Sequence, residues 1–151
     1  MTDEERIAAL EQKVKTLQLT YASALADAVV RYGNEGILDK ITEQKRAEQM
    51  KNGASLAARL GAAEPRQAIE KTRDLFGCAN FICTETYDGF EAVATKCILC
   101  SLSKQMGKFS PCHMFCLSPF EAMIKSISPG AEFDVFSTLW DSEKCMIKVK
   151  T

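Results

Sequence analysis

The spacing of apolar residues changes after Gly77, and no other feature of the sequence constrains the fold as strongly. Before Gly77, apolar residues recur every three or four positions, which is the spacing of one face of a helix. After it, residues 80–87 and 90–97 are rich in β-branched and aromatic side chains, and Asp88-Gly89 between them is typical of a two-residue hairpin turn. The sequence therefore predicts a helical first part followed by a part that contains a sheet.

The first predicted helix begins at a capping box, Thr2-Asp3-Glu4-Glu5, and ends near Gly33. Its apolar or small residues alternate steps of three and four and form a stripe with a heptad period: Ile7, Leu10, Val14, Leu17, Tyr21, Ala24 and Ala28. Such a stripe is either the core-facing side of a packed helix or the seam of a homodimer. Both interpretations stay open from the sequence.

Two more helices are predicted before Gly77. One covers residues 35–60, with a polar middle and apolar anchors at Ile37, Leu38, Ile41, Leu56 and Leu60. The next is a short helix that begins at Glu64-Pro65, because proline suits a first helical position, and that Gly77 ends. The first half of the chain is therefore expected to be helical throughout.

The second half combines strands and helices. After the first hairpin, residues 98–106 read as a short helix closed by Gly107, and a second capping box at Ser118-Pro119-Phe120-Glu121 opens a helix to about residue 127. Residues 132–140 and 145–150 alternate as strands do. We therefore expect an α+β fold in a single domain, residues 1–151. Its helical part is 1–77, and its part 78–151 reads hairpin, helix, helix, hairpin, with helices packed on one antiparallel sheet.

The composition limits the partners of the chain. Its 151 residues are 46% hydrophobic and carry a net charge of −1, so there is enough apolar surface for a core and no positive surplus to bind nucleic acid. No apolar run is long enough to span a membrane, and the acidic N-terminus lacks the pattern of a signal peptide. These features predict a cytoplasmic protein that binds neither membrane nor nucleic acid.

Seven cysteines and one histidine are the most informative polar residues. Cytoplasmic thiols stay reduced and an odd number cannot all pair, so Cys78, Cys83 and Cys145 are expected in the core. Four others fall within 20 residues of one another: Cys97, Cys100, Cys112 and Cys116. The first two share a helix face, and the last two are expected in a proline-bracketed loop over it. This set predicts a site for zinc or an iron–sulfur cluster.

A second interpretation makes Cys112 a nucleophile. Ser110-Pro111-Cys112 resembles a helix start, which favours the thiolate, and His113 is the only histidine available as a base. Adjacent helix residues point about 100° apart, so a direct Cys112–His113 pair has poor geometry. Phe90 and Trp140 are candidates for the wall of an apolar substrate pocket, although aromatic residues in strands often belong to the core.

Several segments together resemble the L-2-amino-thiazoline-4-carboxylic acid hydrolase-like family: Tyr32-Gly33 before a long helix, Gly61 before a capped short helix, Cys97, Cys116, Phe136-Ser137-Thr138-Leu139 and Cys145. The resemblance implies a hydrolase that opens a small ring and leaves a cysteine derivative. It places Cys97, Cys116 and Cys145 at the recurrent cysteines of the family. Ser118-Pro119 and Met146 stand where the family has acidic residues. A more distant similarity links the chain to 4-vinyl-reductase-type ligand-binding domains, some of which hold zinc.

Three functions are thus expected from the sequence. The first is a small-molecule hydrolase of the aminothiazoline carboxylate type, with a cysteine-rich site that binds a metal. The second is a non-catalytic zinc or iron–sulfur protein, and the third is a sensor module that binds a small ligand in an apolar pocket. The identity of the substrate does not follow from the residues.

Overall fold

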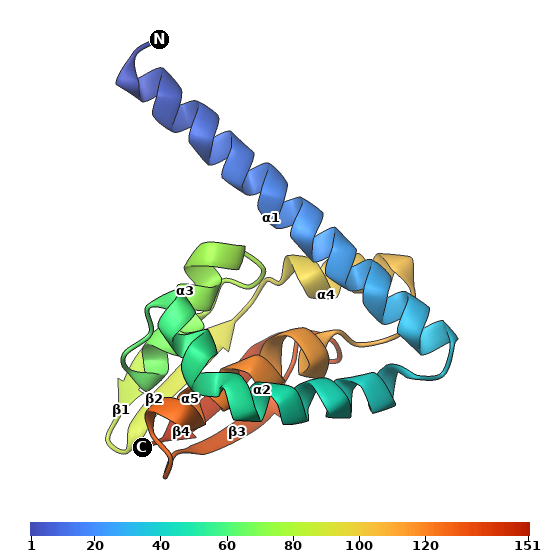
Figure 1. Ribbon diagram of the computed structural model, residues 1–151, viewed down its shortest axis with the longest axis vertical. Helices are drawn as coiled ribbons and strands as arrows, with labels where there is room; N and C mark the ends of the chain where they lie inside the picture. The colour runs from blue at the N-terminus through green and yellow to red at the C-terminus, as the bar shows by residue number, and fades with distance from the viewer.

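The computed structural model describes residues 1–151 and confirms the α+β class (Figure 1). The elements are α1 (Asp3–Asn34), α2 (Leu38–Leu60), α3 (Pro65–Phe76), β1 (Ile82–Thr86), β2 (Gly89–Ala94), α4 (Ile98–Met106), η1 (His113–Leu117), α5 (Ser118–Ile127), β3 (Glu132–Ser137) and β4 (Cys145–Lys150). The four strands form one antiparallel sheet in the order β1-β2-β4-β3. The helical first half and the two flanking hairpins are as predicted.

The sheet buries one face and exposes the other. On the two central strands, β2 and β4, alternate residues are buried: Phe90, Ala92, Ala94, Cys145, Ile147 and Val149. On the opposite face the carboxylate of Glu91 lies 3.9 Å from Nζ of Lys148. This alternation is typical of an antiparallel sheet with one solvated side, so helices cover only the apolar face.

Helix α5 fills that face and is itself buried on several sides. Phe120 of α5 packs edge-on against Phe81, with ring centroids 5.6 Å apart, and Ile124 belongs to the same hydrophobic cluster as Ile147 of the sheet. Helix α2 crosses the outer side of α5 at Gly53, where a Cβ atom would overlap with the carbonyl oxygen of Ala122. Glycine at this position therefore permits the close approach of the two helices.

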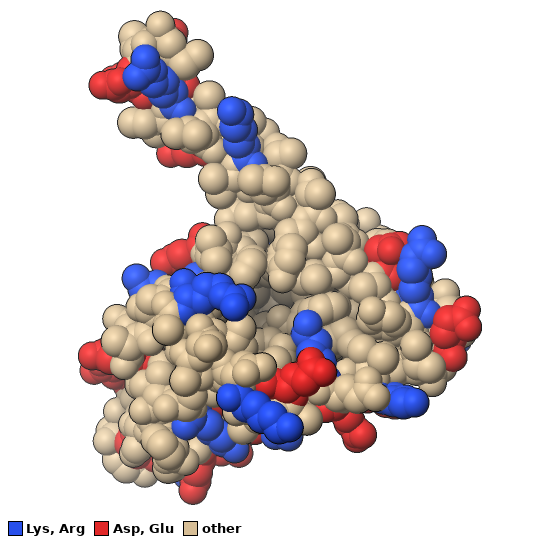
Figure 2. Space-filling view, in the orientation of Figure 1, with Lys and Arg blue, Asp and Glu red and all other residues tan.

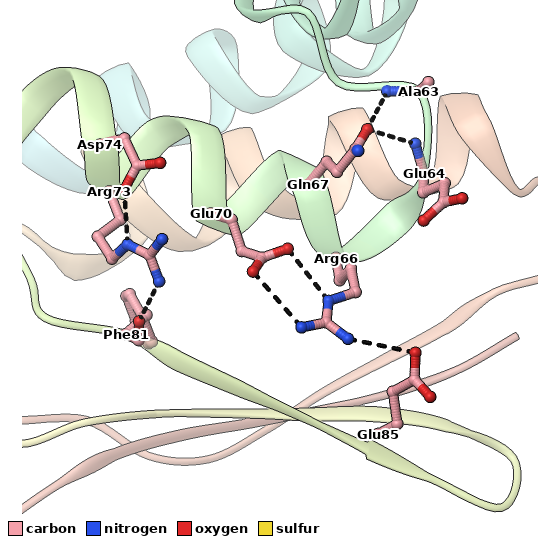
Figure 3. Close-up of polar contacts among 9 residues, drawn as sticks. All are labelled: Ala63, Glu64, Arg66, Gln67, Glu70, Arg73, Asp74, Phe81 and Glu85. Atoms are coloured by element: carbon pink, nitrogen blue, oxygen red, sulfur yellow. Dashed lines mark hydrogen bonds and ion pairs between the residues drawn. The ribbon is translucent and has the colours of Figure 1, made fainter.

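Two arginines attach α3 to the neighbouring sheet (Figure 3). The guanidinium of Arg66 bridges Glu70 on its own helix, at 3.1 Å, and Glu85 of β1, at 3.2 Å. Arg73 donates a hydrogen bond of 2.8 Å to the carbonyl oxygen of Phe81. These contacts connect the start of α3 to β1, and the end of α3 to the residue that precedes β1.

Helix α1 divides into two halves with different surroundings (Figure 1). Its second half packs against α4 and buries Ala22, Ala26 and Val29. Its first half extends beyond the rest of the molecule, so the stripe residues Ile7, Leu10, Val14 and Leu17 are 49–69% exposed. The core-facing interpretation is therefore wrong for this half, because no other element lies along it.

No helix in the structure combines the length and the apolar character needed to span a membrane.

The segment that contains Cys112 and Cys116 is helical, so the predicted loop is wrong. It forms a π-helical turn, η1, that runs directly into α5, and the Ser118 side chain caps nothing. The cause is Pro119, which has no N–H and whose ring would collide with the carbonyl group four residues earlier in a regular α-helix. The wider turn, with a hydrogen bond from Ser118 N–H to His113 O, accommodates that ring.

Both hairpins differ in detail from the prediction. The first turn consists of Tyr87 and Asp88, while Gly89 already pairs with Thr86 in the sheet. A Cβ atom at Gly89 would overlap with the carbonyl oxygen of Val149, so glycine serves strand packing there and not the turn. Strand β3 ends at Ser137, after a register shift that begins at Val135.

Candidate functional site

Six of the seven cysteines line one pocket: Cys78, Cys97, Cys100, Cys112, Cys116 and Cys145. The pocket has a volume of about 360 Å³, and 19 of its 26 lining residues are hydrophobic. All five α-helices or the turns that adjoin them contribute to its wall, and the space-filling view shows the surface hollowed beneath α1 (Figure 2). The predicted set of four cysteines therefore does meet at one place, together with two more.

Backbone pairing brings the first three cysteines together. Ile98 N–H donates a hydrogen bond of 2.7 Å to the carbonyl oxygen of Cys78, and Ala79 forms a bridge with Cys97. Cys97 is the N-cap of α4, and Cys100 lies in the first turn of that helix. The end of α3 and the start of α4 are thereby joined, which places three thiols on one side of the pocket.

The other three cysteines come from η1 and β4. Cys112 directly precedes η1 and Cys116 lies within it, so the π-helical turn sets the position of both thiols. Cys145 begins β4 on the buried face, in line with Ile147 and Val149. The antiparallel sheet thus brings the last of these cysteines, from near the end of the chain, beside residues of the helices.

Cys100 contacts two other sulfur atoms, one through its thiol and one through its backbone N–H. Its Sγ is 3.6 Å from Sγ of Cys112, and its backbone N–H donates to Sγ of Cys97 at 3.4 Å. Hydrogen bonding from Cys100 lowers the pKa of Cys112, against the opposing effect of burial, and the hydroxyls of Ser110 and Thr138 lower it further. Hydrogen bonding from Cys100 is also the main cause that lowers the pKa of Cys97.

The remaining thiols of the pocket are held neutral. Burial raises the pKa of Cys78 to about 11 and that of Cys145 to about 12. Burial raises the pKa of Cys116 well above its ordinary value, and the pKa of Cys100 is raised because its thiol is the shared donor. Negative charge in the pocket is therefore concentrated on Cys112 and Cys97.

The lining contains three basic side chains and no Asp or Glu. Arg73 is engaged by Asp74, at 2.9 Å, whereas Nζ of Lys45 lies 5.0 Å from the centre of the Phe115 ring and has no carboxylate partner. Arg59 also forms no ion pair, and Lys and Arg side chains are visible beside the hollow (Figure 2). The apolar pocket thus has a positive edge, which favours anions.

One polar atom in the lining has no partner. Oε1 of Gln49 is buried and accepts no hydrogen bond, although Gln49 contributes to the pocket wall. Buried polar atoms in folded proteins are almost always paired, so an orphan acceptor at a pocket wall is a candidate contact for a donor group on a ligand.

Three other predicted site residues lie elsewhere. His113 is exposed and lines a separate shallow hollow with Arg46 and Glu121, so the structure does not bring its imidazole to the Cys112 thiol. Phe90 is 4% exposed in the core beneath the helices. Trp140 is half-buried, with Nζ of Lys104 5.7 Å from its ring centre. Neither aromatic residue lines the pocket.

Cys78 and Cys145 were not predicted as site residues, and neither were the α2 residues Lys45, Gln49 and Arg59. The position of Cys145 could have been predicted from the sequence. It lies two residues before Ile147 and four before Val149, so all three side chains point to the same, buried face of the strand. The α2 residues recur at helical spacing along one face, with Leu56 and Leu60, and that face covers the pocket.

All seven cysteines are free thiols, and no group of three or more His, Cys, Asp or Glu side chains has the arrangement of a metal site. Comparison with known proteins gave no match to any protein family, curated protein or solved structure. The resemblance to the aminothiazoline carboxylate hydrolase-like family stays a prediction.

Proposed function

We propose that this protein binds a small, mainly apolar organic molecule with an anionic group, and that the Cys112 thiolate is the reactive group of the site. One observation carries this proposal: six thiols from separate parts of the chain converge on a single apolar pocket of about 360 Å³. Pockets for small organic ligands are commonly about 300–1,000 Å³ in volume and mostly apolar. The pocket belongs to the lower part of that range.

The anionic group of the ligand is proposed from the charges of the wall. Lys45 and Arg59 form no ion pair with a carboxylate, and no Asp or Glu lines the pocket, so Cys112 and Cys97 are the only groups of the wall whose lowered pKa favours negative charge. A carboxylate at the positive edge would gain both cations while its apolar part lies against the hydrophobic lining. Gln49 Oε1 would accept a hydrogen bond from a hydroxyl or amine on the same ligand.

Cys112 supports thiol chemistry on such a ligand. A thiolate is the nucleophilic form of cysteine, and the lowered pKa of Cys112 increases its population at neutral pH. Hydrolysis of the kind that the resemblance implies would begin with attack of Sγ on a C=N carbon. The nitrogen would take the displaced electron pair and the proton of the Cys100 thiol, 3.6 Å from Cys112 Sγ. His113 has no part in this scheme, because it faces another hollow.

A metal is the second candidate occupant, supported by the sulfur contacts around Cys100. Two thiolates bound to one zinc ion at about 2.3 Å each are separated by about 3.8 Å in tetrahedral geometry. The Cys100–Cys112 separation of 3.6 Å is close to that value. Cys97, Cys100, Cys112 and Cys116 are the proposed sulfur ligands for zinc or an iron–sulfur cluster, and their side chains would have to rearrange to bind it, because no three of them have the arrangement of a metal site in the structure. Elemental analysis and an absorption spectrum of protein purified without oxygen test this candidate.

The proposed ligand class is tested with octanoate and octanol as matched probes in isothermal titration calorimetry. We expect octanoate to bind more tightly than octanol. The double variant Lys45→Gln/Arg59→Gln should weaken octanoate binding about three- to tenfold, which corresponds to a loss of about 0.7–1.4 kcal/mol of binding free energy. Octanol binding should not change. Equal affinity for both probes would contradict the anionic group, and no binding of either would contradict the pocket as a ligand site.

We also propose a cytoplasmic location and a homodimer. Seven free cysteines, two of them favouring the thiolate, suit a reducing compartment. The homodimer is supported by the exposed apolar stripe on the first half of α1, since four large apolar side chains in a row are costly to leave in water. A second copy of the chain offers an identical stripe to cover them.

A further inference from the structure

We infer that the first halves of two α1 helices pair as a parallel, in-register, two-stranded coiled coil; this inference rests on the homodimer proposed above. The seam consists of Ile7, Leu10, Val14 and Leu17, which are 56%, 59%, 49% and 69% exposed. The helix carrying them is already formed and begins at a complete capping box. Pairing therefore requires no refolding of the chain.

The residue types at the seam favour two parallel strands. With Ile7 and Val14 at the a positions of the heptad, Leu10 and Leu17 occupy the d positions. β-Branched residues at a and leucine at d are the combination that favours parallel dimers over larger assemblies. The pattern repeats without interruption over both heptads.

The flanking charges select the same orientation. Arg6 and Lys13 occupy g positions, whereas Glu11 and Gln18 occupy e positions. In a parallel dimer each g residue faces the e residue five positions later on the other helix, so Arg6 meets Glu11 of the second copy twice by symmetry. An antiparallel pair with Leu10 opposite Val14 would place Lys13 against Lys13 and Glu11 against Glu11.

The seam ends before Tyr21, whose side chain packs within its own chain. This residue occupies the next a position, but its ring stacks on Phe76 of its own chain, with centroids 5.0 Å apart, and lines the pocket. Beyond it, Ala22, Ala26 and Val29 pack against the body. The coiled coil therefore stops where the pocket begins, and a parallel arrangement places the two pockets of the dimer at the same end.

Sedimentation velocity at increasing protein concentration tests the seam. We expect the wild type to pass from monomer to dimer, and Leu17→Glu to stay monomeric with an unchanged circular dichroism spectrum. The matched control is Leu19→Glu, which changes a residue that is 51% exposed but lies off the stripe, and which should dimerise as the wild type does. A wild type that stays monomeric at every concentration contradicts both the homodimer and the inference. Equal loss of dimer in both variants contradicts the seam.

Orientation is tested separately by the variant Asp3→Cys, which adds a thiol at the d position before the seam and removes no apolar residue. In the parallel dimer the two new thiols are adjacent, and we expect a disulfide-linked dimer in a glutathione buffer, with wild type as the control. In an antiparallel dimer centred on the seam they lie about 27 Å apart, because 18 residues of helix separate them. A dimer without this crosslink overturns the parallel orientation and leaves the homodimer standing.

Discussion

Cys100 has one thiol proton and two neighbouring sulfurs that can accept it. Through the 3.6 Å contact to Cys112 and the hydrogen bonding to Cys97, this residue lowers the pKa of both neighbouring thiols. Because the proton is shared, Cys97 and Cys112 titrate as a linked pair and not as independent thiols. The chemistry of the pocket thus depends on a residue that is itself kept neutral.

Replacing Cys100 with alanine should raise the pKa of Cys112, because the main hydrogen bond that stabilises the thiolate is lost while burial is unchanged. The measurement is the rate of Cys112 alkylation by iodoacetamide against pH, read by mass spectrometry. In the wild type we expect the midpoint below the ordinary value of 9.0, and in Cys100→Ala a shift upward. Cys83→Ser, which changes the one cysteine outside the pocket, is the control and should leave the Cys112 profile unaltered.

Alkaline pH should destabilise the fold. Burial raises the pKa of Cys78 and Cys83 to about 11 and that of Cys145 to about 12, above the 9.0 of an unfolded chain. Above pH 9 the unfolded chain therefore loses protons that the folded chain keeps, and stability decreases as pH rises. Thermal melts should show Tm falling between pH 9 and 11, and falling less in Cys145→Ala. A Tm that is constant or rises over this range would contradict the burial of these thiols.

The structure brings some of the predicted site residues together and places others elsewhere, for reasons that concern single residues. The four clustered cysteines do line one pocket, because short spacing and helix geometry are local properties. Lys45 and Gln49 were not predicted, since nothing in the sequence indicates that α2 folds back over the cysteines. His113 lines another hollow, because its direction depends on the π-helical turn, whose cause, Pro119, lies six residues away.

At the scale of elements, the contact between α2 and α5 joins two helices of the pocket wall. Both helices line it, and Gly53 allows their backbones to meet without an intervening side chain. The long α2 was predicted correctly as a helix, but its partner was not predictable. Helical periodicity identifies a buried face without saying which element covers it.

Gly53→Ala should therefore lower the free energy of unfolding by about 1–3 kcal/mol, as other substitutions that overfill a packed contact do. The added Cβ would press on the backbone of Ala122, which cannot rotate away as a side chain can. Urea unfolding followed by circular dichroism measures the change. Gly130→Ala is the matched control, because nothing lies within 4 Å of its Cβ position and its φ is not positive. Equal effects of the two substitutions would contradict the account of the α2–α5 contact.

The hairpins illustrate how far local signals extend. The sequence predicted both hairpins, because alternation and turn residues are local, yet it assigned Gly89 to the turn. In the structure Gly89 is a strand residue that must be small because β4 passes close by. That requirement is a long-range packing effect, and the same is true of the irregular end of β3, where the register shifts between Val135 and Ser137.

At the scale of the whole molecule, one helix links two surfaces. The second half of α1 covers the pocket through Tyr21 and Leu25, while its first half presents the apolar stripe. The sequence predicted a continuous stripe and left open which surface it would meet. The structure shows that the stripe runs from an exposed extension onto the body, a division that only the tertiary fold determines.

Occupancy of the pocket should stabilise the whole fold. A ligand that binds only the native state raises the free energy of unfolding as its concentration increases. We expect Tm to rise with octanoate concentration, and to rise less in Lys45→Gln/Arg59→Gln at the same concentration. A Tm that falls with octanoate would indicate binding to the unfolded chain and contradict a native binding site.

The central claim is that the anionic apolar ligand and the reactive thiol share one site, and the rate of Cys112 alkylation with and without octanoate tests it most directly. We predict that iodoacetamide reacts with Cys112 more slowly in proportion to the fraction of pocket occupied. The half-buried thiol of Cys83, outside the pocket, should react at an unchanged rate. Alkylation of Cys112 at the same rate in saturating octanoate, or equal slowing at Cys83, would contradict the claim.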